Sequence, residues 1–518
     1  MITFILFFAL IALILYYIYV YKSIHYRYDK HGIKYFPGIP VLGNFWRSTL
    51  CMNHMFDDID KIYNAFPDER YVGFVEGTTP TILIRDPELI KQVAVKDFDH
   101  FSNHRPFLGS EVDTFIENML FNLTGDKWHE MRTTLSPAFT GAKMRHMMPF
   151  MTDVANNIID YLKEHSNEEI DVTDVMQCYT NDVIASAAFG LQVNSLKDRN
   201  NEFYVIGQGL FHFTLWQRIV LLLINQCPQF TKKLGIKLFP KKTIDFFKTI
   251  VKSTMEYREK NNVERPDMIQ LLMEASKETL SGTKEKDIGI SDEKTGDSSL
   301  RKWNLEDLSA QVFVFFVAGF DTTSSALVMC IHELAIHHDL QEKLYQEIKN
   351  FKEKNGKLTF ETVGELKYLE GVINETLRLW TSAIVLDRVC TKPYELPPPH
   401  EGGKPYLVRP GEMVFNCVNS VHLDKEYYSE PDVFDPERFS EDNKHHLKPS
   451  TFMPFGSGPR TCIGARFALL ELKVILYTLL FNFKIVKSPK TTDPLRLVTK
   501  DFSMKAENGT WVKFEKRD

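Results

Sequence analysis

The chain has 518 residues, of which 44% are hydrophobic, 13% aromatic and 25% charged, a composition near the globular average that excludes general disorder. Its formal net charge of −6 provides no basic field for phosphate backbones, which argues against nucleic acid as a partner. The seven cysteines are odd in number and widely scattered, which indicates free thiols in a reducing compartment rather than a disulfide framework.

The first expected element is a membrane anchor over residues 1–21. Its run ITFILFFALIALILYYIYVY has about the 20 apolar positions that a bilayer span needs, with tyrosines at its end. No small-residue cleavage site follows, so a cleaved signal peptide is only the alternative. Basic residues follow instead, and the positive-inside rule places this basic linker, residues 22–36, in the cytosol. Residues 37–518 are expected to form one large domain.

The body of the chain is expected to be mainly α with a smaller β region. It begins with FPGIPVLG, residues 36–43, whose prolines and glycines exclude a helix and predict a rigid elbow. Strand-like runs occur only near the start, in PTILIRD (80–86), and in scattered later pieces such as PYLV and GEMVFN between 405 and 416. Residues 204–240 are apolar but broken by Gly, Pro and basic residues. They predict a buried helix pair or, alternatively, a surface element that dips into a membrane.

A long apolar helix is expected after Asn304, which is a suitable N-cap with Asp307 at the third helical position. The apolar run is too short to span a bilayer, so the helix should cross the protein core. In its middle, Gly319 lacks a side chain, while Asp321 and Thr322 place polar groups where helices disfavour them. Such a local conflict is often functional, although a polar kink in a core helix is the simpler alternative.

The segment FMPFGSGPRTCIGARFALLELK sets Cys462 on a glycine-rich, cationic turn. A thiol binds metal as the thiolate, which cations and backbone N–H groups stabilise. Arg460 supplies a cation, and the helix expected after Gly464 points its N-terminal dipole at the sulfur. Haem iron suits one isolated cysteine, whereas zinc and iron–sulfur clusters need several. The alternative is that Cys462 is only a small buried hydrophobe.

The pattern Phe455-x-x-Gly458-x-Arg460-x-Cys462-x-Gly464 resembles, position for position, the haem-binding signature of the cytochrome P450 haem-thiolate monooxygenases. This resemblance implies haem b, which is Fe-protoporphyrin IX, with Cys462 as its axial thiolate and only metal ligand. It also implies that Phe455 packs beside the sulfur and that Arg460 binds a haem propionate. Gly464 would let the following helix approach the porphyrin.

Further motifs of the same family extend the resemblance along the chain. Trp128 and Arg132 match its W-x-x-x-R pair, which binds propionates, and Arg388 is expected to do the same. Four residues apart on a helix, Trp128 and Arg132 share a face, so an ordinary amphipathic helix is the alternative. The resemblance makes Thr322 and Asp321 catalytic, with Thr322 bonded to the bound oxygen and Asp321 supplying protons.

In the same motif, the resemblance implies that Gly319 leaves room for dioxygen. A structural motif follows at Glu375-Thr-Leu-Arg378, which with Arg438 resembles the family's buried Glu–Arg–Arg lock behind the haem. Alone, an acid and a base three residues apart are common on helix surfaces. The residues after this helix, Trp380-Thr-Ser-Ala383, depart from the prolines of many relatives.

Candidate substrate contacts are apolar, which predicts a lipophilic small-molecule substrate. They are Phe107, Phe213, Val314, Val317, Ala318, Ala383 and Leu386. The segments FSNHRPF, AGFDTTSSAL and NETLRLW resemble insect microsomal members of the family. That resemblance implies insertion of one oxygen atom of O2 into xenobiotics such as insecticides or plant toxins. Alternatives are an endogenous hormone or hydrocarbon hydroxylase, a haem-thiolate isomerase or dehydratase that needs no reductase, and non-enzymatic haem binding.

The chain carries no flavin or nicotinamide motif of its own. Its NADPH and flavins are therefore expected to act only through a partner, which the resemblance identifies as NADPH cytochrome P450 reductase, with cytochrome b5 as a second donor. The expected location is the endoplasmic reticulum membrane, with the catalytic domain, residues 37–518, facing the cytosol.

Overall fold

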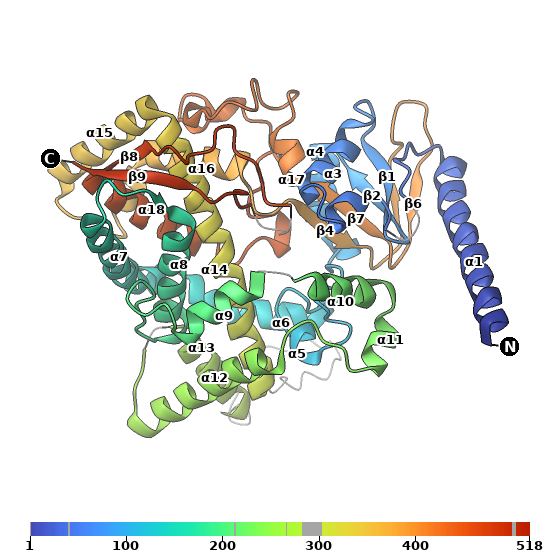
Figure 1. Cartoon of the computed structure of the whole chain (residues 1–518), viewed down its shortest axis with the longest axis horizontal. Helices are drawn as coiled ribbons and strands as arrows, with labels where there is room; N and C mark the ends of the chain where they lie inside the picture. The colour runs from blue at the N-terminus through green and yellow to red at the C-terminus, as the bar shows by residue number, and fades with distance from the viewer. Residues whose placement is uncertain are drawn as a thin grey trace, which may run out of the picture.

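The computed structural model describes residues 2–39, 42–211, 214–265, 267–281, 303–499 and 504–517. Figure 1 shows a β-rich part, a larger helical part and the helix α14 running through the helical part. The chain is thus mainly α with a smaller β region, as predicted. The helices are α1 (Ile2–His31), α2 (Trp46–Thr49), α3 (Met55–Asn64), α4 (Pro87–Lys91), α5 (Thr114–Glu117), α6 (Gly125–Leu135), α7 (Gly141–Glu164), α8 (Val172–Phe189), α9 (Glu202–Phe211), α10 (Leu215–Gln226), α11 (Pro228–Lys233), α12 (Lys241–Asn261), α13 (Met268–Ser281), α14 (Leu305–Ile336), α15 (His338–Asn355), α16 (Lys367–Leu379), α17 (Val418–His422) and α18 (Ala465–Asn482).

The strands form three small sheets. They are β1 (Tyr71–Glu76), β2 (Thr79–Ile84), β3 (Ile170–Asp171), β4 (Val385–Val389), β5 (Tyr394–Leu396), β6 (Tyr406–Val408), β7 (Met413–Cys417), β8 (Phe483–Lys487) and β9 (Trp511–Lys516). The largest sheet has the order β1-β2-β7-β4, with β2 and β7 parallel and the other neighbours antiparallel. The named strand-like runs correspond to β2, β6 and β7, whereas β1, β3, β4, β5, β8 and β9 were not individually predicted.

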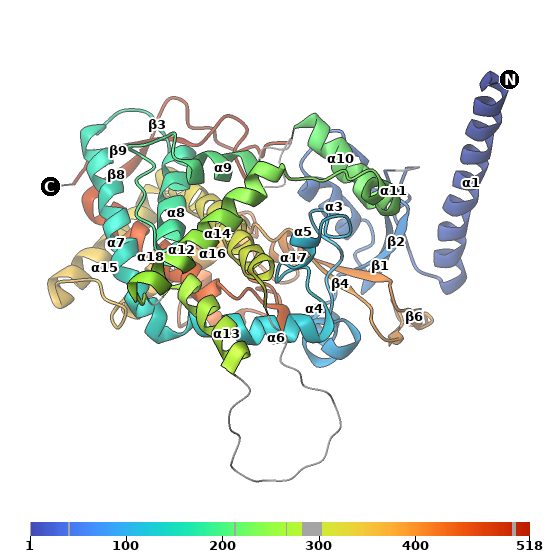
Figure 2. The same cartoon turned by 90° about the horizontal axis from the view of Figure 1, so that it is seen from below.

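Helix α14 begins as the sequence predicts. The Asn304 side chain accepts a hydrogen bond from the Asp307 N–H (2.9 Å), and the Asp307 carboxylate accepts one from the Asn304 N–H (3.1 Å). Within the described residues, α14 is the one helix long and apolar enough to cross a membrane, but most of that run is buried in the protein. It packs against α8, α12, α16 and α18, as Figure 2 allows the reader to follow. The prediction that this helix crosses the core is therefore confirmed, whereas the expectation that its apolar run is too short to span a bilayer is wrong.

Helix α1 continues without a break through most of the segment predicted as a linker, ending at His31. Its last turns dock on the largest sheet through Tyr28, which is 1% exposed. The Tyr28 hydroxyl donates to the Phe74 carbonyl (2.7 Å) and accepts from the Thr81 N–H (2.9 Å). Its ring occupies the space where a side chain at Gly73 would lie. The boundary between anchor and linker stays a prediction.

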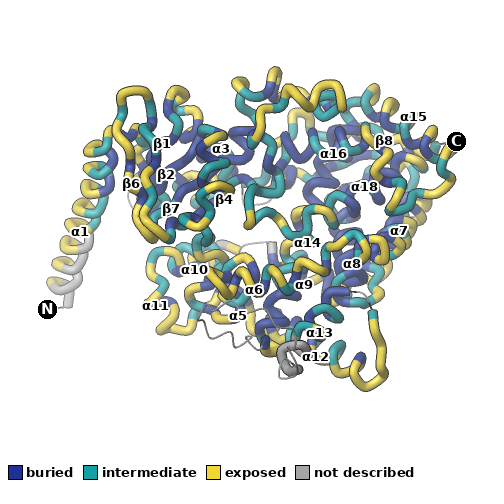
Figure 3. Tube along the Cα trace, turned by 180° about the vertical axis from the view of Figure 1, so that it is seen from behind, coloured by how far each residue is buried: buried dark blue, intermediate teal, exposed yellow. Residues whose placement is uncertain are grey.

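The apolar run over residues 204–240 forms α9, α10 and α11 among the residues that the structure describes. One face of α10 is buried at Val220 and Ile224, while Trp216 is 66% exposed. In α11 Phe230 is exposed, and Leu234 follows it in the same state. The burial colouring of Figure 3 shows this mixture along α10 and α11. A fully buried helix pair is thus wrong for α10 and α11, because these large apolar side chains face outward.

Candidate functional site

The turn that carries Cys462 is closed by its own backbone. The Cys462 N–H donates to the Phe455 carbonyl (2.8 Å), and the Thr461 hydroxyl donates to the same oxygen (3.1 Å). Gly458 has φ +74°, and a Cβ there would lie 1.9 Å from the Ala94 carbonyl oxygen. Only glycine fits at this close approach of two backbones. The cysteine therefore sits on a turn whose shape the backbone fixes.

The Cys462 side chain is exposed, yet protein atoms surround it closely enough to change its acidity. Burial raises the pKa of the thiol, while the Gly464 N–H and the Arg132 guanidinium lower it less. We call the space beside this sulfur, which solvent reaches, the hollow. The expectation that neighbouring groups alone hold the sulfur as an anion is not met, because burial outweighs them. A bound metal cation would deprotonate such a thiol.

Arginines from three separate segments meet beside this turn. Arg132 on α6 donates to the Thr461 carbonyl (2.9 Å), and Arg388 on β4 donates to the Ser457 carbonyl (3.2 Å). The Arg460 guanidinium lies over the Trp128 ring, 4.1 Å from its centroid. The sequence thus singled out four side chains that the fold brings to one place.

The arginine group has hydrogen-bond donors that no described residue uses. The Arg388 Nε and the Arg460 Nη1 atoms are buried without a hydrogen-bond partner in the part of the chain that the structure describes. Burial, with the nearby charge of Arg388, lowers the pKa of Arg460 to about 9. Buried polar groups without partners are rare in folded proteins. Two free N–H groups in a cationic cluster beside a cysteine fit the carboxylates of a haem.

Helix α14 supplies the facing wall. Ala318 and Thr322, one turn apart, are exposed although most of the helix around them is buried, and Val314 and Val317 are half-buried. The Thr322 hydroxyl donates to the Ala318 carbonyl (2.7 Å). Because side chains four residues apart share a face, Val314, Ala318 and Thr322 form one stripe along the helix.

The two walls are linked through Phe139. Its ring lies 3.8 Å from the position of a Cβ at Gly464 and 5.4 Å, between centroids, from Phe315 on α14. Ile463, the neighbour of Cys462, packs against the same apolar cluster as Val317. The hollow therefore lies between the cysteine turn and the exposed stripe of α14.

Asp321 and Gly319 face other parts of the protein. The Asp321 carboxylate is buried and lies 2.8 Å from the Lys505 ammonium. A Cβ at Gly319 would lie 2.2 Å from the Cδ1 atom of Ile184 on α8. The expectation that Gly319 leaves room for dioxygen is therefore wrong, since Ile184 fills that space and the glycine serves close packing of α14 on α8.

The expected lock is assembled in full and buried. Both Glu375 and Arg378 are 0% exposed, and two hydrogen bonds of 2.7 and 2.8 Å join them. The Arg438 Nε donates to the Glu375 carboxylate (3.3 Å), as does the Asp435 N–H (2.9 Å). A buried carboxylate with this many donors is well satisfied. Sequence reasoning missed His422, which binds Arg378 and gave no motif signal.

The turn after α16 is held by a side chain instead of prolines. The Trp380 indole N–H donates to the Glu333 carboxylate on α14 (2.8 Å). This turn leads to Ala383 and Leu386, both half-buried. Leu386 lies 3.6 Å from the position of a Cβ at Gly456, so it borders the cysteine turn.

The expected substrate contacts also include Phe107 and Phe213. Phe107 is 42% exposed, with its ring 5.1 Å from that of Phe121. Phe213 lies outside the described residues.

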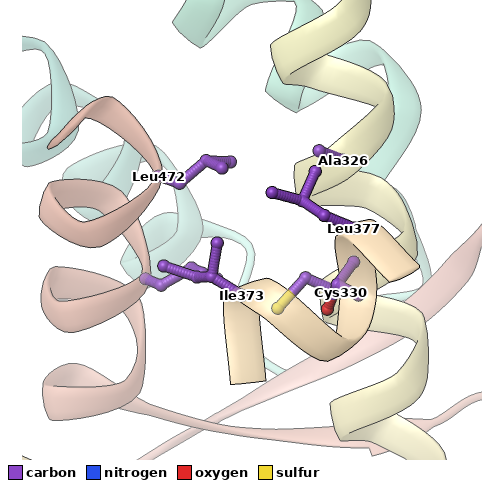
Figure 4. Close-up of a pocket in the computed structure, with 7 residues that line it drawn as sticks. Ala326, Cys330, Ile373, Leu377 and Leu472 are labelled. Atoms are coloured by element: carbon purple, nitrogen blue, oxygen red, sulfur yellow. The ribbon is translucent and has the colours of Figure 1, made fainter. Parts of the chain in front are cut away.

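A second opening lies farther along α14, beyond Thr322, and is unsuited to a ligand. Figure 4 shows it between α14, α16 and α18, lined by apolar groups such as Leu377 and Leu472 and by Cys330. It does not admit a water molecule. It is a packing gap, and the hollow beside Cys462 is the candidate site.

Comparison with known proteins agrees with this geometry. The family model described as cytochrome P450 matches residues 34–512. The probable cytochrome P450 9f2 of Drosophila melanogaster is 40% identical over 99% of each chain. Cytochrome P450 9e2 of Blattella germanica is 38% identical over 95% of this chain and 94% of its own, and cytochrome P450 6k1 of that species is 36% identical over 96% and 94%. The chain therefore belongs to the cytochrome P450 family and is an oxidoreductase, a haem-thiolate monooxygenase.

Proposed function

We propose that this monooxygenase binds haem in the hollow with Cys462 as the axial ligand and oxidises lipophilic small molecules. The observation that supports it most directly is the pairing of an exposed, protein-enclosed sulfur with unpartnered guanidinium N–H groups on Arg388 and Arg460. Trp128 and Arg132 complete the propionate site from α6. Phe455 and Gly464 border the sulfur along the chain.

When bound, the haem supplies activation of O2 and transfer of one oxygen atom to the substrate. The residues of the chain would hold the haem, orient the substrate and supply protons. Cys462 would hold the haem through its thiolate. The Thr322 hydroxyl, exposed on the facing wall, would place a hydrogen-bonding group in the hollow. Asp321 would carry protons from the side of Lys505, with which it pairs.

The substrate class follows from the character of the facing wall. Val314, Val317 and Ala318, with Ala383 and Leu386 from the other side, offer apolar surface to a ligand. We therefore propose xenobiotics such as insecticides or plant toxins as substrates. An endogenous hormone or hydrocarbon is the second candidate, because the same apolar surface suits it. An isomerase or dehydratase is less well supported, since it would not need Asp321 and Thr322.

Electrons are proposed to come from NADPH through a membrane-bound cytochrome P450 reductase, with cytochrome b5 as a second donor. The proposed location is the endoplasmic reticulum membrane, with residues 1–21 as anchor. Large apolar side chains of α1 such as Phe4 and Phe8 are exposed, which suits contact with lipid. In both Figure 1 and Figure 2 the N-terminal end of α1 lies toward the same side of the molecule as α10 and α11. The exposed Trp216 and Phe230 support a second membrane contact there.

The spectrum of the reduced protein with carbon monoxide tests the ligand. Thiolate ligation is expected to give a red-shifted Soret band in the wild type, and Cys462→Ala is expected to abolish it. A wild-type spectrum without that band would refute the proposal. Arg132→Ala offers a control that weakens haem retention without removing the sulfur.

Turnover with reductase, NADPH and a panel of lipophiles tests the substrate class. Comparable rates on several insecticides and plant toxins would support a detoxifying enzyme. One dominant endogenous substrate would refute that role while leaving the monooxygenase assignment intact. Product formed without reductase or NADPH would favour the isomerase instead.

A further inference from the structure

His422 lies at the end of α17, between the Glu375–Arg378 lock and the segment that leads to Cys462. It is 0% exposed. Its Nδ1 lies 3.1 Å from the Arg378 carbonyl oxygen, and the Met453 N–H donates to its Nε2 (3.0 Å). Arg378 returns a hydrogen bond from its Nη1 to the His422 carbonyl (2.8 Å). One imidazole thus connects the lock with the start of the cysteine segment.

The two partners define one form of the ring. A carbonyl oxygen can only accept, so Nδ1 must carry the proton; a backbone N–H can only donate, so Nε2 must be bare. The imidazole is therefore neutral and in a single tautomer. Burial, with the charge of Arg378, lowers the pKa of His422 to about 3, which is consistent with this form.

Hydrogen bonds within the segment from Met453 to Cys462 couple the position of Met453 to that of the Cys462 sulfur. The Met453 carbonyl accepts from the Gly456 N–H (3.0 Å), and the Phe455 carbonyl accepts from the Cys462 N–H (2.8 Å). The Phe452 ring stacks on the His422 ring, with centroids 5.5 Å apart. The Cys462 turn is therefore hydrogen-bonded to the first residues of its own segment, and Met453 in that segment is hydrogen-bonded to His422.

We propose that His422 is a positioning residue, which couples the lock to residues 453–462 and thereby fixes the Cys462 sulfur relative to the metal it binds. The proposal rests on the proposed ligation by Cys462. It assigns His422 no contact with substrate or haem. The bond that matters most is the one accepted from the Met453 N–H, because it reaches the cysteine segment.

Two substitutions of His422 distinguish between the two hydrogen bonds that its ring makes. In His422→Gln, the amide can reach the place of Nε2 and accept from the Met453 N–H. In His422→Asn, the shorter side chain places its amide near Nδ1, where it can donate to the Arg378 carbonyl but does not reach Met453. The Gln variant should therefore rescue the function of the ring, and the Asn variant should not.

Two readouts on the haem-loaded protein report this coupling. We expect His422→Asn to increase hydrogen exchange at the Met453 and Cys462 amides by about tenfold, as for a lost buried hydrogen bond. It should also lower the fraction of the reduced carbon monoxide complex that shows the red-shifted Soret band. His422→Gln should match the wild type in both readouts.

A destabilised control excludes a merely structural role. Gln341, 1% exposed, donates to the Leu334 and Ile485 carbonyls far from the cysteine segment. Gln341→Ala should lower the melting temperature without changing the Soret band or the exchange at Met453. If His422→Asn behaves like Gln341→Ala, the inference is overturned while ligation by Cys462 stands. A wild type without the red-shifted band would instead overturn the proposed function.

Discussion

The two walls of the hollow are built by different means. On the cysteine side, backbone hydrogen bonds, a buried lock and a cluster of arginines hold each group from several directions, and the glycine at 458 admits no side chain. On the α14 side, the exposed stripe consists mainly of small apolar side chains, and Thr322 bonds only within its own helix in the contacts described. Polar bonding fixes geometry, whereas apolar surface tolerates exchange. The comparison teaches that the proposed ligation would depend on the cysteine wall, whereas the α14 wall carries most of the proposed substrate contacts.

Breaking the lock should have the largest effect on the cysteine wall. Glu375→Ala leaves the buried Arg378 without its carboxylate, which should cost about 3–5 kcal/mol in the free energy of unfolding. Urea unfolding and the haem content per chain measure the effect. Glu375→Gln keeps the size of the side chain and one hydrogen-bond acceptor. Its free energy of unfolding should therefore lie between those of the wild type and Glu375→Ala. An unchanged unfolding midpoint in Glu375→Ala would show that the cysteine wall does not depend on the lock.

Lowering the pH should reduce the free energy of unfolding through the titration of His422, which supports the same wall. Its pKa of about 3 in the folded chain lies below the unfolded value of about 6.5. Above pH 6.5 the ring is neutral in both states; as the pH falls, only the unfolded chain gains the proton, so stability is lost. Between pH 6.5 and 4.5 the loss should be about 2 kcal/mol. His422→Gln should remove this part of the pH dependence, and equal slopes for both proteins would contradict it.

Substitution of Gly319 tests whether this residue of α14 serves close packing against α8. Gly319→Ala places a methyl group against the Ile184 Cδ1 atom and should cost about 1–3 kcal/mol by overpacking. Ile184→Val removes that atom, so the double variant should regain much of the loss. Thermal unfolding of the three variants completes a double-mutant cycle. Additive losses would mean that the two residues do not compete for space.

Thr322 should have the smallest effect on stability and a clear effect on chemistry. Thr322→Ala removes an exposed hydroxyl from the hollow and should leave the melting temperature nearly unchanged. It should retain haem but divert NADPH to hydrogen peroxide, lowering the product formed per NADPH consumed. Thr322→Ser keeps the hydroxyl and should restore much of the coupling. Coupling that is unchanged in Thr322→Ala would remove Thr322 from the proposed proton path.

Local patterns predicted those features that depend on nearby residues. The cap at Asn304, the buried course of α14 and the start of α18 after Gly464 follow from propensity and capping. The pairing of Glu375 with Arg378 follows from their spacing on one helix face. Family resemblance supplied the partners that spacing cannot, such as Arg388 beside the cysteine turn.

Features that depend on contacts distant in sequence were not predictable. The role of Gly319 depends on Ile184, which lies on another helix, and the pairing of Asp321 depends on Lys505 near the end of the chain. His422 belongs to no motif, because its two partners are backbone groups that any residue carries. Its importance is visible only once the chain is folded.

The docking of α1 through Tyr28 has a consequence for how the enzyme would sit on a bilayer. A domain joined to its membrane helix by a flexible linker can take many orientations relative to the bilayer. Here the segment proposed as the anchor and the turns that dock on the sheet belong to one continuous helix, which is held where the Tyr28 ring covers Gly73. With residues 1–21 embedded as proposed, the tilt of that helix would set the tilt of the whole body, and membrane thickness would decide how deeply α10 and α11 are immersed.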